Sequence, residues 1–153
     1  IANTTVGGGF MVAPIRDFLR RGIKVGLGTD SGGGWASQML AVIRQAMIAS
    51  NAREVLSQGK DKALSLEEVF YLATLGGARV LCLEDRIGNF EVGKEFDATW
   101  VTTTTGLHSA MTPREDGGSL RGLLEQYVMT GDDRNVAPVF VRGRRVGWRR
   151  QYE

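Results

Sequence analysis

The chain has 153 residues, of which 42% are hydrophobic and 24% charged, and its formal net charge is +2. This composition is typical of a globular domain and excludes a disordered chain. The small charge gives no reason to expect a nucleic-acid partner, the single cysteine Cys82 excludes an internal disulfide, and no apolar run reaches the roughly 18 residues that span a membrane. We therefore expect a cytoplasmic protein without a nucleic-acid or membrane partner.

The first predicted elements are a loop and a helix. Residues 1–9 are small and polar with three consecutive glycines, which favours a loop that enters the structure. A helix is predicted over residues 13–21, with Pro14 in its first turn and Gly22 as its stop. The chain begins at Ile1 rather than at methionine, and a complete eight-stranded α/β barrel needs at least about 200 residues. Any barrel interpretation therefore makes the chain a piece of a larger protein.

The next segment, residues 23–34, has the sequence IKVGLGTDSGGG and contains the first candidate for a functional residue. Apolar residues alternate with small ones in its first half, namely Ile23, Val25 and Leu27 with Gly26 and Gly28. This alternation predicts a buried strand that packs closely on another layer and ends at Asp30. The carboxyl end of such a strand is where barrels and open α/β folds carry their chemistry, so Asp30 is the first candidate for a functional residue.

Three interpretations of Asp30 follow from the residues alone. A phosphate cradle is disfavoured, because the glycines form G-x-G-x-x-x-G, one residue too long for the dinucleotide fingerprint, and no Gly-Lys-Ser/Thr follows. Asp30 or Ser31 could instead cap a helix that begins near Trp35, and the pattern alone favours this interpretation. The third interpretation is a metal ligand at the mouth of a barrel, which requires partner ligands elsewhere.

Helices are predicted after the glycines. The first should begin near Trp35, with an apolar face formed by Trp35, Met39, Val42, Ile43, Ala46 and Met47. Ser65 and Glu68 form a capping box, so a second helix should begin directly after Ser65. Gly76 and Gly77 are expected to break this helix and to let residues 78–83 continue as another helical piece.

Beyond Glu84 the sequence changes to glycine-punctuated β structure, which predicts a boundary between residues 1–84 and residues 85–153. Residues 102–118 show no periodicity and predict a long loop. This loop holds the lone histidine, His108, which has no partner at ligand spacing. We therefore interpret His108 as a surface residue and not as a metal ligand.

A last helix and a hairpin are predicted toward the C-terminal end of the chain. The helix is expected over residues 119–130, with inward residues Leu120, Leu123, Leu124, Tyr127 and Val128. A polar turn, GDDRN, leads to a hairpin around Gly143. The arginines of this hairpin alternate with apolar residues, which indicates one solvated strand face and not a nucleic-acid tail.

Several runs of this sequence resemble parts of one known family. GLGTD resembles its eighth barrel strand, which ends in a metal-binding aspartate, and LSLEEVFYLATLGGARVL resembles the helical segment that follows. IGNFEVGKEFDATWV resembles the return into a β-sandwich, and GDDRN and VFVRGRRV resemble the C-terminal turn and hairpin. The family is the amidohydrolase superfamily and, within it, the guanine deaminases. The resemblance extends from about Pro14 onward.

The resemblance implies an α/β fold, made of the last β/α units of an amidohydrolase TIM-like barrel followed by the C-terminal part of a small β-sandwich domain. It also implies hydrolysis of guanine to xanthine and ammonia by a protein that holds one zinc ion. Such an ion lowers the pKa of its bound water to about 7. Of this site Asp30 alone carries over, as a zinc ligand and as the catalytic group that passes the water's proton to the leaving amine. A homo-oligomer is expected.

The sequence also departs from the family. The family's histidine ligands have no counterpart here, and the groups that bind guanine lie upstream of Ile1, so we interpret the chain as a C-terminal portion that is inactive alone. Two alternatives stay open: an aminohydrolase or chlorohydrolase of the same superfamily acting on another heterocycle, and a non-catalytic structural or interaction fragment. Zinc deaminases of the cytidine type are excluded, because their Pro-Cys-x-x-Cys motif needs two cysteines.

Overall fold

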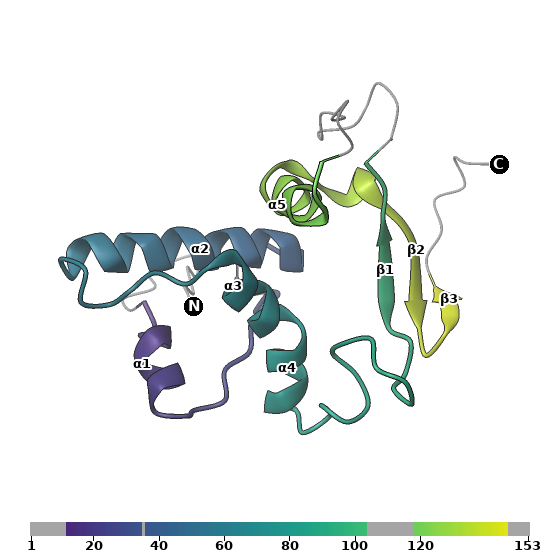
Figure 1. Cartoon of the computed structure of the whole chain (residues 1–153), viewed down its shortest axis with the longest axis horizontal. Coiled ribbons are helices and arrows are strands. Elements are labelled where there is room, and N and C mark those ends of the chain that lie inside the picture. Colours follow the sequence, from purple (N-terminus) through teal and green to yellow (C-terminus); the bar gives the residue numbers. More distant parts are fainter. Residues whose placement is uncertain (1–11, 35, 104–117, 147–153) are drawn as a thin grey trace. The chain divides into compact units, whose positions relative to one another are not determined.

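The computed structural model describes residues 12–34, 36–103 and 118–146. The chain divides into two compact units, unit 1 (Ile1–Asn89) and unit 2 (Phe90–Glu153). Within the described residues, unit 1 is helical and unit 2 holds a three-stranded sheet with an α-helix (Figure 1). None of the helices in these ranges is long and apolar enough to cross a membrane. The predicted loop over residues 1–9, Trp35 and His108 lie outside the described residues.

The first helix, α1 (Ile15–Arg20), lies within the predicted range. After its last turn Gly22 has φ 71°, a left-handed conformation that glycine adopts without steric cost. Gly22 N donates to Leu19 O and Ile23 N donates to Phe18 O, both at 3.0 Å. These are the two hydrogen bonds of a Schellman C-cap, so the predicted stop at Gly22 is confirmed.

The helix α2 (Met39–Leu56) begins later than predicted, since its N-cap is Gln38 and not a residue near Trp35. One side of it is buried, through Val42, Ile43, Ala46 and Ser50. The Ser50 hydroxyl accepts a hydrogen bond from Leu64 N at 2.8 Å, which joins α2 to the chain just before the next helix. A second side of α2 also carries apolar residues, and these are exposed: Ile48, Val55 and Leu56.

The capping box before α3 (Leu66–Ala73) is confirmed. Glu68 N donates to Ser65 Oγ at 3.2 Å, and Ser65 N donates to Glu68 Oε2 at 2.8 Å. Leu64 and Val69, on either side of this box, are both buried. The start of α3 is therefore fixed by local hydrogen bonds and by apolar side chains that point into unit 1.

The break after α3 lies at Thr74, with φ −124° and ψ −99°, and α4 (Leu75–Val80) follows at once. The prediction that Gly76 and Gly77 break the helix is wrong, because both lie inside α4. Their small size serves a close approach instead. A Cβ added to Gly76 would lie 3.1 Å from the carbonyl oxygen of Val25, which belongs to the segment after α1.

The prediction of a strand over residues 23–29 is also wrong for the described structure, in which this segment has no strand partner. A strand is defined by ladder hydrogen bonds to a neighbour, and the described part of unit 1 supplies helices instead. Leu27 N donates to Leu72 O of α3 at 3.0 Å. Gly26 faces Gly77, since a Cβ on Gly26 would lie 3.0 Å from the Gly77 Cα. The segment therefore packs backbone to backbone against α3 and α4.

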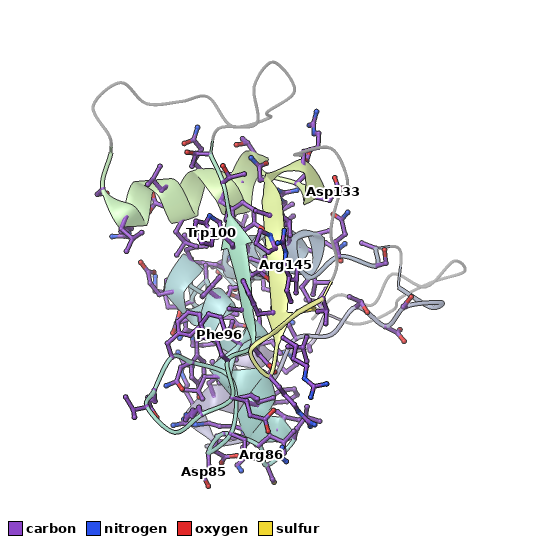
Figure 2. All side chains as sticks on the ribbon, turned by 90° about the vertical axis from the view of Figure 1, so that its right-hand side faces the viewer. Asp85, Arg86, Phe96, Trp100, Asp133 and Arg145 are labelled. Carbon is purple, nitrogen blue, oxygen red and sulfur yellow. The ribbon has the colours of Figure 1, made fainter. Side chains whose placement is uncertain are left out.

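Unit 2 is built on an antiparallel sheet in the order β1 (Ala98–Val101), β2 (Val136–Val141) and β3 (Arg144–Val146). The register of β1 against β2 shifts between Thr99 and Val101, which marks an irregularity at Trp100. Trp100 is 64% exposed. Figure 2 shows Trp100 on β1 and Arg145 on β3. The sheet of unit 2 therefore leaves large side chains uncovered within this chain.

The predicted hairpin around Gly143 is confirmed. Arg142 has φ 51° and Gly143 has φ 73°, the pair of positive values that a two-residue type I′ turn requires. Arg142 N donates to Asp97 Oδ1 at 2.7 Å, and Gly143 N donates to Phe96 O at 2.9 Å. The tip of the hairpin is thus held by the residues that precede β1.

The helix α5 (Leu120–Thr130) begins at the N-cap Ser119, whose hydroxyl accepts from Gly122 N at 3.1 Å. Of the predicted inward residues Val128 is fully buried, whereas the inward prediction for Leu120 is wrong, since this first residue of α5 is 84% exposed. The GDDRN run forms a short 3₁₀ helix, η2 (Asp133–Asn135).

Asn135 is fully buried and joins two distant parts of unit 2. Its Nδ2 donates to Thr102 O at 3.0 Å, and its Oδ1 accepts from Asp132 N at 3.1 Å. The backbone closes the same junction, since Thr102 N donates to Asn135 O at 2.8 Å. A buried amide with these partners meets the requirement that buried polar groups be hydrogen-bonded.

Candidate metal-ligand site around Asp30

Asp30 lies at the start of a tight turn that follows residues 23–29. It is exposed and has φ 48°, a left-handed conformation that aspartate tolerates better than most residues. Its carbonyl oxygen accepts hydrogen bonds from Gly33 N, at 2.9 Å, and from Gly34 N. The backbone therefore folds back directly after Asp30.

The glycines of this turn allow two close approaches. A Cβ added to Gly34 would overlap Thr29 O, so no side chain fits there without a change in the backbone. A Cβ added to Gly33 would lie 3.0 Å from Asp30 Oδ2. The Asp30 carboxylate is therefore folded over Gly33. Gly33 and Gly34 are not among the residues predicted to be functional, although the consecutive glycines after an acidic residue are a signal for such a turn.

The segment that carries Asp30 is anchored to the rest of unit 1 by its other end. Leu27 N is hydrogen-bonded to α3, and Gly26 packs on α4. Lys24 Nζ lies 3.6 Å from Glu84 Oε1. A hydrogen bond between the Glu84 carboxylate and the Glu84 backbone lowers the pKa of Glu84, and the nearby charge of Lys24 lowers it further. Asp30 thus extends from a segment fixed on helices α3 and α4.

The structure decides against one of the three interpretations of Asp30. The cap interpretation is wrong, because α2 begins at Met39 with Gln38 as its N-cap, well after Asp30 and Ser31. The metal-ligand interpretation stays a prediction. A carboxylate oxygen is a suitable zinc donor, and an exposed position lets it reach a shared ion.

The described residues do not by themselves supply a zinc site. Among residues 12–34, 36–103 and 118–146, no group of three or more His, Cys, Asp and Glu side chains could hold a metal ion. A zinc site needs three or four protein ligands. Asp30 fits as one donor of such a set, and the remaining donors would have to come from outside the described residues.

A family model described as the Amidohydrolase family matches residues 10–146, and the chain belongs to this family. Among curated relatives, the guanine deaminase of Homo sapiens is 38% identical over 147 residues, which cover 95% of this chain and 32% of the relative. The chain therefore spans about a third of the length of the curated relatives it matches.

Solved structures of deaminases are also similar to this chain. A guanine deaminase from C. acetobutylicum with bound guanine in the active site is similar with a TM-score of 0.77 and 32% identity, covering 93% of this chain and 31% of that one. An adenosine deaminase from Xanthomonas campestris with bound zinc is similar with a TM-score of 0.67 and 28% identity, covering 87% of this chain and 28% of that one.

Proposed function

We propose that the protein to which this chain belongs hydrolyses guanine to xanthine and ammonia, and that this chain contributes one acidic residue, Asp30, to its zinc site. The observation that carries the proposal is the similarity to guanine deaminases along nearly the whole chain, 38% identity over 95% of it for the human relative. The guanine deaminase of Escherichia coli is likewise 40% identical over 81% of this chain, which favours guanine over another heterocycle.

The proposal includes an arrangement for the whole protein. Residues 1–84 would belong to the end of a metal-dependent (β/α) barrel, and residues 85–153 to its return and to a β-sandwich. Residues 23–29 form no strand within the described residues, but their packing against α3 and α4 supports this, because the inner layer of a barrel packs against the surrounding helices. We also propose a homo-oligomer in the cytoplasm.

In this arrangement Asp30 would have two tasks. One carboxylate oxygen would bind the zinc ion, together with ligands from the rest of the protein. The carboxylate would also accept a proton from the attacking water and return it to the leaving amine. Zinc, when bound, would supply the Lewis acidity that makes water nucleophilic at neutral pH.

The substitution Asp30→Asn in the whole protein tests the proposal. Asparagine keeps the size of the side chain but cannot accept the proton, so we expect the deamination rate to fall by about 10²- to 10⁴-fold. Asp85→Asn is the matched control, because Asp85 is an exposed aspartate of unit 1 far along the chain from Asp30 (Figure 2). Xanthine formation and zinc content are measured for both. If Asp30→Asn keeps the turnover and zinc content of the control, the proposed role of Asp30 is wrong.

A further inference from the structure

The carboxylate of Asp30 occupies the space that a side chain on Gly33 would need. The three heavy atoms nearest to an added Cβ are Asp30 Oδ2 at 3.0 Å, Cγ at 3.4 Å and Oδ1 at 3.5 Å. All three belong to the same carboxylate. The backbone of Gly33 is not in the left-handed region, in contrast to that of Gly32 with φ 104°, so alanine is compatible with its conformation. The contact with Asp30 is therefore what glycine avoids at this position.

The turn gives the carboxylate one way to respond to such a contact. The Asp30 carbonyl is held by the amides of Gly33 and Gly34, and Gly34 lies against Thr29 O with no room for a side chain. Because these contacts hold the backbone of Asp30 and Gly34, the Asp30 side chain would respond by rotating about its χ1 bond. A methyl group on Gly33 would therefore turn the carboxylate away from its present direction.

We infer that Gly33 is a positioning residue, whose missing side chain sets the direction in which the Asp30 carboxylate meets zinc in the whole protein. This inference rests on the proposed function. Zinc accepts carboxylate oxygens within a narrow range of about 2.0–2.2 Å. A constellation of this kind tolerates displacements of only about 0.5 Å. A shift forced by a 3.0 Å contact is on that scale.

The test compares Gly33→Ala with Gly28→Ala in the whole protein. Gly28 lies in the same segment, and a Cβ there meets no atom within 4 Å, so it controls for adding a methyl group next to Asp30. Zinc affinity is measured by competition with a chelator, together with kcat, KM and the melting temperature. We expect Gly33→Ala to weaken zinc binding by about 10-fold or more and to lower kcat more than it raises KM. Gly28→Ala should match the unsubstituted protein.

A double-mutant cycle keeps the inference testable if Gly33→Ala folds poorly. Asp30→Gly removes the carboxylate and suits φ 48°. In that background Gly33→Ala should cost little further stability, because the three atoms nearest to the added methyl group are gone. An equal loss of melting temperature in both backgrounds would overturn the inference.

The outcomes separate the inference from the proposed function. If Asp30→Asn loses activity while Gly33→Ala binds zinc as tightly as the Gly28→Ala control, Gly33 has no positioning role and the function of Asp30 stands. If Asp30→Asn keeps zinc and activity, the proposed role of Asp30 is wrong and the inference on Gly33 falls with it. Weakened zinc binding in both Asp30→Asn and Gly33→Ala supports the inference.

Discussion

Arg16 holds the carboxylate of Glu68 with two hydrogen bonds, from Nη1 to Oε1 at 2.6 Å and from Nη2 to Oε2 at 2.8 Å. The same guanidinium donates to the carbonyl oxygens of Lys62 and Ala63, at 3.1 and 2.7 Å. Glu68 also accepts from Ser65 N as part of the capping box. One arginine of α1 thus fixes the turn before α3 and the first turn of α3 together.

This pairing predicts a pH dependence of stability. The hydrogen bond from Arg16 lowers the pKa of Glu68 below its usual value. A lowered pKa in the folded state stabilises the protein at pH values above the unfolded pKa of about 4.3, and this stabilisation is lost as the pH falls through the folded pKa. We expect the contribution to be about 0.5–1 kcal/mol, because Glu68 is 38% exposed and solvent screens the pair.

Urea unfolding of Glu68→Gln between pH 7 and pH 3 measures this contribution. The variant should be less stable at pH 7 and should lose less stability on acidification than the unsubstituted chain. Glu67→Gln is the matched control, since Glu67 is the exposed acidic neighbour in the same helical turn. Equal acid sensitivity of Glu68→Gln and the unsubstituted chain would contradict the prediction.

The capping box gives a second prediction. Ser65→Ala removes the acceptor of Glu68 N and should lower the free energy of unfolding by about 1 kcal/mol. Ser65→Asp should be close to neutral, because aspartate is as good an N-cap as serine. Thermal or urea unfolding of both variants checks this, and a neutral Ser65→Ala would show that the first turn of α3 is already frayed.

The contact between Gly26 and Gly77 gives a third prediction. Gly26→Ala places a methyl group 3.0 Å from the Gly77 Cα and 3.4 Å from Val80 Cγ2. The nearest of these neighbours is backbone and cannot turn aside, so the free energy of unfolding should fall by about 1–3 kcal/mol. Gly28→Ala, which meets no atom, should be neutral or stabilising by up to about 1 kcal/mol. Similar effects of the two substitutions would argue against the packing of this segment on α4.

A fourth prediction concerns the purified chain of 153 residues. One carboxylate cannot replace the three or four protein ligands of a zinc site, so the chain should hold no stoichiometric zinc and should not turn over guanine. Metal analysis and a xanthine assay test this directly. About one zinc per chain after dialysis would show that this chain supplies ligands besides Asp30.

The fifth prediction concerns the outward side of α2. Ile48, Val55 and Leu56 are 69%, 77% and 84% exposed, and their spacing places them on one helical face. An apolar face of this kind favours association, so the purified chain should self-associate in sedimentation experiments. Val55→Glu should weaken the association, while Thr130→Glu, which adds the same charge at an exposed residue of α5, should change it less. A compact monomer at high concentration would contradict this prediction.

The features that the sequence predicted correctly are those set by neighbours in the chain. Ser65 and Glu68 lie three residues apart, and the capping box needs only the backbone between them. The hairpin turn likewise depends on Gly143 and the residue before it. In both cases the physical cause lies within one turn of the chain, where a pattern of residue types is sufficient.

The features that the sequence did not predict depend on contacts between distant residues. The helix breaks at Thr74, and Gly76 instead lies against the carbonyl of Val25, which comes much earlier in the chain. Arg16 and Glu68 are separated by 52 residues, so neither suggests the other. At the candidate site the chain position of Asp30 followed from the pattern. The close approach of the Asp30 carboxylate to Gly33 could not be predicted from the pattern, because it depends on the direction of one side chain.

The junction between Thr102 and Asn135 has a consequence for the register of the sheet. Two hydrogen bonds join these residues, from Asn135 Nδ2 to Thr102 O and from Thr102 N to Asn135 O. Asp132 N donates to Asn135 Oδ1, so the same side chain also holds the turn that leads into β2. One amide side chain therefore fixes where β2 begins opposite the end of β1, next to the pairing of Val101 with Val136.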